Sequence, residues 1–184
     1  SLPWRVCFVL SAIFMGIGGP MHPGGTMAEM LASPVWFAGH AWVCAAFVAL
    51  LVGLVLYGRA VVVPARTRRW LQIAIVVTAL QTIEMAVHAA AYVDLQNLLA
   101  GRSTPVLSTH LMMTVIIYPI FGVLMSGFII VAARERALGA LWMGWIGVIG
   151  ALAHGAAGLL VVGFNSEVAR LGFPLIMLVM IWAL

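Results

Sequence analysis

The sequence has no lysine and very little charge of either sign. Charged residues make up 8% of its 184 residues, and all nine basic residues are arginines. A soluble domain of this size would carry about three times that fraction of charge. Without a lysine amine, the chain cannot form the Schiff base that holds retinal or pyridoxal phosphate. The arginines also form no basic stripe, so we expect no nucleic-acid partner.

Cysteine is scarce as well. Cys7 and Cys44 both lie inside apolar segments, so the sequence implies no disulfide framework. The sequence contains no nucleophile triad, phosphate-binding loop or dinucleotide fingerprint. The apolar segment 4–17 has some features of a secretory signal. Because no A-x-A-like cleavage site follows it, we interpret it as a retained first helix.

Apolar residues, in contrast, are abundant and come in long blocks. They make up 65% of the chain and fill stretches such as 41–58, 70–93 and 111–133. Each block is long enough to cross a hydrocarbon core of about 30 Å as a helix. The sequence therefore predicts an all-α polytopic membrane protein with the lipid bilayer as its surroundings. We expect one domain, 1–184, with a central up-and-down bundle formed by the second to fifth of six helices. The expected helices span about 3–18, 36–58, 70–93, 106–133, 138–163 and 171–184.

The arginines predict which way the helices run through the membrane. Two of them, Arg102 and Arg170, fall in loops on one side. The others fall on the opposite side: Arg5, Arg59, Arg66, Arg68, Arg69, Arg134 and Arg136. Arginine-rich loops face the cytoplasm. We therefore expect a cytoplasmic N-terminus in a bacterial-type inner or plasma membrane, with loops 19–35, 94–104 and 164–170 facing outward.

Histidines are the one feature of the sequence that indicates chemistry. Each of four predicted helices carries one of them toward the outward side: His40, His88, His110 and His154. Glu84 lies one helical turn from His88. Ionisable residues inside a membrane are costly and rare, so we treat these as candidate site residues. His22 lies in the loop between Pro20 and Pro23 on the same side, and we interpret it as a solvated loop residue.

The depth of the histidines supports a first hypothesis, a b-type haem. Counting 1.5 Å per residue, His40 and His110 lie shallow, whereas His88 and His154 lie about a turn deeper. Diagonal partners in the bundle would then pair at equal depth. His88 and His154 fit best as axial ligands, because alanines and glycines beside them leave room for a porphyrin. The expected function is electron transfer with a quinol or an external partner.

This arrangement resembles, in architecture, the histidine-ligated helical bundles of membrane cytochromes b and succinate dehydrogenase anchors. It departs from their two-haem pattern, because all the histidines lie toward one side. A relay of electrons across the bilayer is therefore not expected.

Two alternatives remain open. In the first, a non-haem copper, zinc or iron ion is bound by imidazoles and a carboxylate. Its candidate ligands are His40, Glu84, His88, His110 and His154. In the second, the histidines only form hydrogen bonds between helices, and the protein is an accessory subunit of a membrane complex without a cofactor. The sequence does not decide whether the protein is an enzyme.

Overall fold

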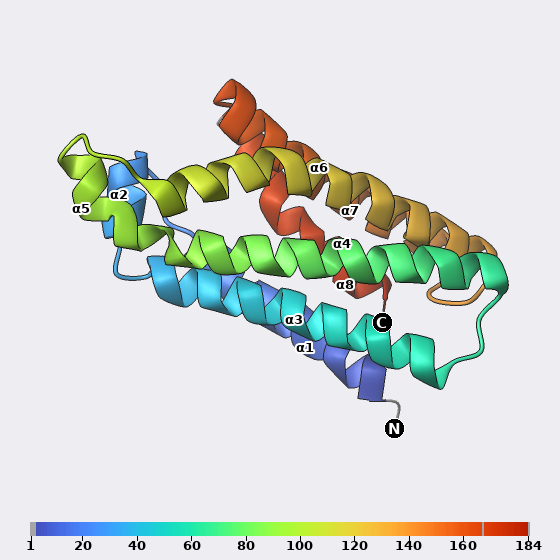
Figure 1. Cartoon of the computed structure of the whole chain (residues 1–184). Helices are drawn as coiled ribbons and strands as arrows, with labels where there is room; N and C mark the ends of the chain where they lie inside the picture. The colour runs from blue at the N-terminus through green and yellow to red at the C-terminus, as the bar shows by residue number, and fades with distance from the viewer. Residues whose placement is uncertain (1–2, 167, 184) are drawn as a thin grey trace.

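The structure is a computed structural model that describes residues 3–166 and 168–183 (Figure 1). The described residues contain helices and no strand, so the predicted all-α class is confirmed. Five helical segments are long and apolar enough to cross a membrane. Their α-helices are α1 (Pro3–Gly18), α3 (Trp36–Ala60), α4 (Ala65–Ala90), α6 (Pro105–Arg134) and α7 (Leu141–Phe164). The chain is thus a polytopic protein whose helices fit an integral membrane protein.

The long helices pack in the order of the chain. α1 lies against α3, α3 against α4, α4 against α6, and α6 against α7. The C-terminal segment, η3 (Val168–Ile176) and α8 (Met177–Trp182), packs on α7, and α8 also contacts α1. The first and last elements therefore close the row of helices into a ring. Figure 1 shows the long helices running nearly parallel or antiparallel to one another.

The surface of this ring is apolar. Large aliphatic side chains are exposed along its helices: Val48, Val52, Val76, Ile83, Ile116, Ile120, Val123 and Ile149. Inside, a core of fully buried aromatic rings includes Phe8, Phe47, Phe121 and Phe128. Such a helix bundle, apolar on both its inside and its outside, is what a lipid environment requires.

Local signals explain where the helices begin. Thr26 and Glu29 form a capping box at the start of the short helix α2 (Met27–Ala32). The two hydrogen bonds that Thr26 donates to this carboxylate lower the pKa of Glu29. Pro105 occupies the first position of α6, where a missing N–H costs nothing. The buried Asp94 carboxylate accepts the N–H of Leu107 at 2.9 Å, which satisfies another free donor of that first turn.

Two short elements extend α4 beyond its last α-helical turn. They are η2 (Ala91–Asp94) and α5 (Leu95–Leu99), and they bring the continuous helical segment to 65–99. At its other end α4 begins at Ala65, earlier than the expected start near 70. The expected helix 70–93 left Arg66, Arg68 and Arg69 in the loop before it, and this expectation is wrong. Pro64 precedes the helix, and these arginines lie on its first turns, where long side chains can extend to the membrane surface.

Small residues bring α6 and α7 close together. A Cβ on Gly122 would lie 2.7 Å from the Ala151 carbonyl oxygen, and one on Gly155 would lie 2.8 Å from the Tyr118 carbonyl oxygen. These distances are too short for any larger residue. The two helices therefore pack through their backbones, as small-residue interfaces do in membranes.

The last predicted span is not one continuous α-helix, and this corrects the expected helix 171–184. Residue 184 lies outside the described residues. The segment is a 3₁₀ stretch, η3, followed by the short α8. Pro174 lies inside the stretch and lacks a backbone donor. Gly172 also presses against α7, since a Cβ there would lie 2.6 Å from the Ala153 carbonyl oxygen.

Candidate metal centre

The histidines gather at one end of the ring. This end, here called the histidine end, is formed by the start of α3, the end of α4, the start of α6 and η1 (Gly19–Met21). The opposite end carries most of the arginines and is called the arginine end. Two groups of side chains at the histidine end could hold a metal ion. The groups share His88.

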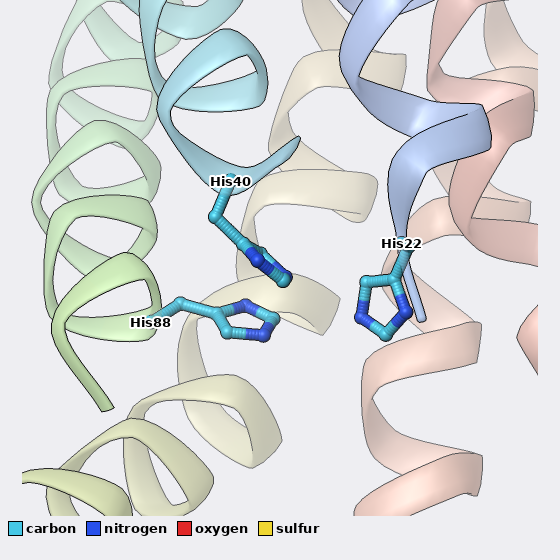
Figure 2. A group of neighbouring side chains, drawn as sticks. All are labelled: His22, His40 and His88. Atoms are coloured by element: carbon cyan, nitrogen blue, oxygen red, sulfur yellow. The ribbon is translucent and has the colours of Figure 1, made fainter. Parts of the chain in front are cut away.

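The first group consists of His22, His40 and His88. One ligand atom from each ring lies within 4.8 Å of the others. Figure 2 shows the three rings facing one another from three different segments of the chain. The ring centroids lie 4.2 Å apart for His40 and His88, and 4.9 Å apart for His22 and His40. The three imidazoles are therefore close enough together that they could hold a metal ion.

The second group consists of Glu84, His88 and His110, again with ligand atoms within 4.8 Å of one another. His88 and His110 are stacked, with ring centroids 3.8 Å apart and an interplanar angle of 26°. His88 therefore lies between the other histidines, in contact with His40 on one side and His110 on the other. Its Nδ1 is buried without a hydrogen-bond partner.

Backbone carbonyl groups fix the proton on two of these rings. Nδ1 of His40 lies 2.6 Å from the Trp36 carbonyl oxygen, and Nδ1 of His22 lies 2.9 Å from that of Pro23. A carbonyl only accepts, so Nδ1 carries the proton and Nε2 keeps its lone pair. Nε2 of His40 is buried and has no partner. The arrangement leaves imidazole lone pairs available to an ion.

Glu84 orients His110. The carboxylate is fully buried, and its Oε1 accepts the Nδ1 proton of His110 at 2.7 Å. The Thr114 hydroxyl lies 3.1 Å from the same oxygen, and the Gln81 amide donates to Oε2 at 3.2 Å. With both carboxylate oxygens in hydrogen bonds, Glu84 is better suited to hold His110 than to bind an ion itself. A histidine ligand commonly donates its second N–H to a carboxylate in this way.

His22 was not among the site residues expected from the sequence, and the structure brings it to the cluster. The residue is exposed overall, yet its ring lies beside those of His40 and Trp36. Partial desolvation lowers the pKa of His22, and the charge of Arg170 adds to this, although the bond to the Pro23 carbonyl opposes it. Its neutral, metal-binding form is thereby favoured. The signal in the sequence that could have placed His22 at the cluster was the proline-rich loop around it. In the structure η1, which contains Pro20, packs against α3 and holds this loop there.

His154 lies apart from the cluster. Its ring is stacked on Tyr118 with centroids 4.7 Å apart, and its other ring contacts are with Phe47, Phe121 and Phe173. It belongs to neither metal-binding group among the described residues. The expected pairing of His88 with His154 by depth is therefore not the one observed, because His88 stacks on His110. The depth of a histidine along its helix does not determine which neighbouring side chain its imidazole stacks on.

A cavity of about 540 Å³ borders both regions. His22, His40, His88 and His110 line one part of it, and Tyr118 and His154 line another. The rest of its wall is largely apolar, with Met15, Met27, Met30 and Met85 among the lining residues. The volume is within the range of small-molecule sites. The histidine cluster thus faces a space that a ligand of moderate size could enter.

No protein-family model, curated protein or solved structure matches this chain. Its function therefore has to be argued from the chemistry of the histidine end. Two of the three interpretations of the sequence need something bound there, and the third needs only hydrogen bonds between helices.

Proposed function

We propose that the protein binds a non-haem transition-metal ion at the histidine end. The ligands are His22, His40 and His88, and His110 stands beside them, oriented by Glu84. The observation that carries this proposal is the convergence of three imidazoles from three segments within 4.8 Å of one another. Nitrogens bound at about 2.0–2.1 Å to one ion lie about 3.3 Å apart in a tetrahedral site. Small ring movements would bring the observed atoms to that spacing.

The hydrogen bonds around the rings support the same conclusion. His22, His40 and His110 each direct Nδ1 to an oxygen: the carbonyls of Pro23 and Trp36, and the Glu84 carboxylate. Metal-bound histidines show this pattern, because the second bond fixes the tautomer and the ring orientation. The three rings therefore share one protonation pattern, in which Nε2 keeps its lone pair.

A purely structural role is less well supported. Histidines that only join helices would form hydrogen bonds through both ring nitrogens, since an unpaired polar atom is costly in a membrane. Here Nε2 of His40 and Nδ1 of His88 are buried without partners. A bound cation would satisfy the lone pair of His40 and, in the tautomer that leaves Nδ1 unprotonated, that of His88. The cost of leaving them unpaired favours a ligand.

Imidazole ligands suit zinc, copper or iron, and the donor set does not choose among them. Three protein ligands leave a position open, which is the arrangement of catalytic rather than structural zinc sites. The cavity beside the cluster would give a substrate access to that position. We therefore favour a centre that acts on a bound molecule over one that only stores an ion.

The haem hypothesis has weaker support. Two axial ligands must approach one iron end-on from opposite faces of a porphyrin. His88 instead lies face to face with His110, and the ring contacts of His154 lie elsewhere. Electron transfer with a quinol or an external partner remains a prediction. A metal centre could carry it out without a porphyrin.

Metal analysis and a visible spectrum of one purified sample test the proposal. We expect about one equivalent of zinc, copper or iron per chain, no Soret band, and scattering from three or four imidazoles in X-ray absorption. His40→Phe should lose the metal. His154→Phe is the matched control, because it replaces a histidine of the same cavity outside the cluster, and it should retain the metal.

Two results would contradict the proposal. One is a protein that holds no metal after loading and dialysis. The other is a red preparation with stoichiometric haem, which would restore the porphyrin hypothesis.

A further inference from the structure

We propose that the part of the cavity around His154 binds a phenol- or quinol-type molecule, through a hydroxyl group that donates a hydrogen bond to Nε2 of His154. This inference rests on the proposed function, because the same cavity borders the metal centre and would hold the molecule that the metal acts on. It assigns a role to the one membrane histidine that the cluster does not include.

The hydrogen bond of His154 decides which kind of group it can bind. Its Nδ1 lies 3.1 Å from the Phe173 carbonyl oxygen, so Nδ1 carries the proton and Nε2 is an acceptor. This Nε2 is buried and has no partner, and the whole residue is only 3% exposed. A partner for it must bring a donor. A hydroxyl group does so without carrying a charge into the membrane.

The break in the C-terminal segment sets this geometry. Phe173 lies in the 3₁₀ stretch η3, immediately before Pro174. Irregular backbone at membrane depth is tolerated where it lines a cavity or is buried in protein. Phe173 and Pro174 both line the cavity, and the Phe173 carbonyl holds His154 in its tautomer. The irregular segment is thus part of the site.

The walls around His154 favour a flat apolar ring. Tyr118 is stacked on the imidazole at 4.7 Å with an interplanar angle of 19°. Phe47, Phe121 and Phe173 place their rings about the same imidazole at 5.9–6.0 Å, and of these Phe173 lines the cavity, as Tyr118 does. Aromatic side chains prefer offset-stacked or edge-to-face contacts with other rings. An aromatic ligand that carries a hydroxyl would match both the walls and the acceptor.

The site also lies deeper than the metal cluster. His154 precedes the end of α7 at Phe164 by ten residues, or about 15 Å, whereas His110 follows the start of α6 at Pro105 by five, or about 7.5 Å. A molecule that enters from the lipid phase could hold its hydroxyl at His154 and extend toward the histidine cluster. The depth of the site and the largely apolar wall of the cavity together favour a molecule that is soluble in the membrane.

The test compares two probes that differ in one property. Tetramethylhydroquinone has the hydroxyl donors, and its dimethyl ether keeps the ring and methyl groups but cannot donate. Calorimetric titration of the purified protein in detergent, without oxygen, should show the hydroquinone binding at least tenfold more tightly than the ether. His154→Phe should lose this preference. Tyr57→Phe, an aromatic change at the arginine end, should keep it.

Equal binding of the two probes to the wild-type protein would overturn the inference, and this comparison does not depend on the folding of any variant. An unchanged preference in His154→Phe would overturn it too. The metal content of the same samples separates the two proposals. Hydroxyl preference without metal contradicts only the metal centre, and metal without hydroxyl preference contradicts only this site.

Discussion

At the arginine end of the bundle, polar side chains bond to other helices and turns, whereas at the histidine end the imidazoles of His40, His88 and His154 each leave one ring nitrogen buried without a partner. The Tyr57 hydroxyl of α3 donates to the Ala137 carbonyl oxygen at 2.6 Å. Glu135 accepts the backbone N–H of Thr67 at 3.2 Å and the hydroxyl of the same residue. These bonds tie the turn between α6 and α7 to α3 and α4. The arginine end is built for stability.

The unpaired polar atoms at the two ends also differ, although both ends include an indole N–H, that of Trp36 at the histidine end. Near the arginine end they include the indole N–H groups of Trp4 and Trp182, which can only donate and cannot bind a cation. At the histidine end, Nε2 of His40 and His154 are lone pairs. The type of an unpaired atom is therefore more informative than its presence. Unpaired acceptors on residues that line a cavity indicate a ligand.

Loss of His88 should have the largest effect, because both metal-binding groups include it. We expect His88→Ala to reduce the bound metal from about one equivalent per chain to near zero, measured by elemental analysis. Tyr57→Phe is the control at the other end. It removes one hydrogen bond, which should destabilise the protein by about 1–3 kcal/mol without loss of metal. Retention of metal in His88→Ala would contradict the assignment of the metal site to the histidine end.

The second prediction tests whether the arginine end carries stability. Phe128 is fully buried and contacts the ring of Trp182 edge-on, with centroids 5.8 Å apart. Phe128→Ala should lower the free energy of unfolding by about 3–5 kcal/mol, because it leaves a cavity in the core. Unfolding by denaturant in detergent measures the change. Metal bound per folded chain should stay the same, and a parallel loss of metal would show that the ends are coupled.

The third prediction concerns how the histidine end holds its rings. Glu84→Gln keeps the size of the side chain but removes the carboxylate that orients His110. We expect the affinity for metal to fall about 10–100-fold, as it does when such second-sphere partners are changed. Competition with a chelator of known affinity measures it. An unchanged affinity would show that His110 contributes nothing to the centre, and complete loss of metal would show that Glu84 is itself a ligand.

The sequence was sufficient to predict the class of the fold and the gathering of the histidines. Long apolar blocks define spanning helices, and alternating helix directions bring His40, His88 and His110 to one end. Spacing along each helix also associated Glu84 with the site. These features depend on helix period and length alone, which a single sequence displays.

The contacts within the site depend on packing that the sequence does not display. Nothing in the spacing indicates that His88 would stack on His110 while His154 stacks on Tyr118. Close contact of α6 and α7 through Gly122 and Gly155 shapes this region of the bundle. His22 joined the cluster because η1 packs on α3, a tertiary contact of a loop. The contact between α1 and α8 that closes the ring of helices likewise depends on tertiary packing.

The smallest effect should come from a single hydroxyl at the histidine end. The Thr114 hydroxyl lies 3.1 Å from Oε1 of Glu84 and 2.9 Å from the His110 carbonyl oxygen. Thr114→Val keeps the shape and removes that bond, so the affinity for metal should fall by about 1 kcal/mol, or about fivefold. Ser126→Ala is the matched control. Ser126 lies on the same helix and bonds the Gly122 carbonyl four residues back, as Thr114 does with His110, but has no hydrogen bond to Glu84. Its removal should leave chelator competition unchanged. If both variants weakened metal binding equally, the hydroxyl would act through helix α6 as a whole and not through Glu84.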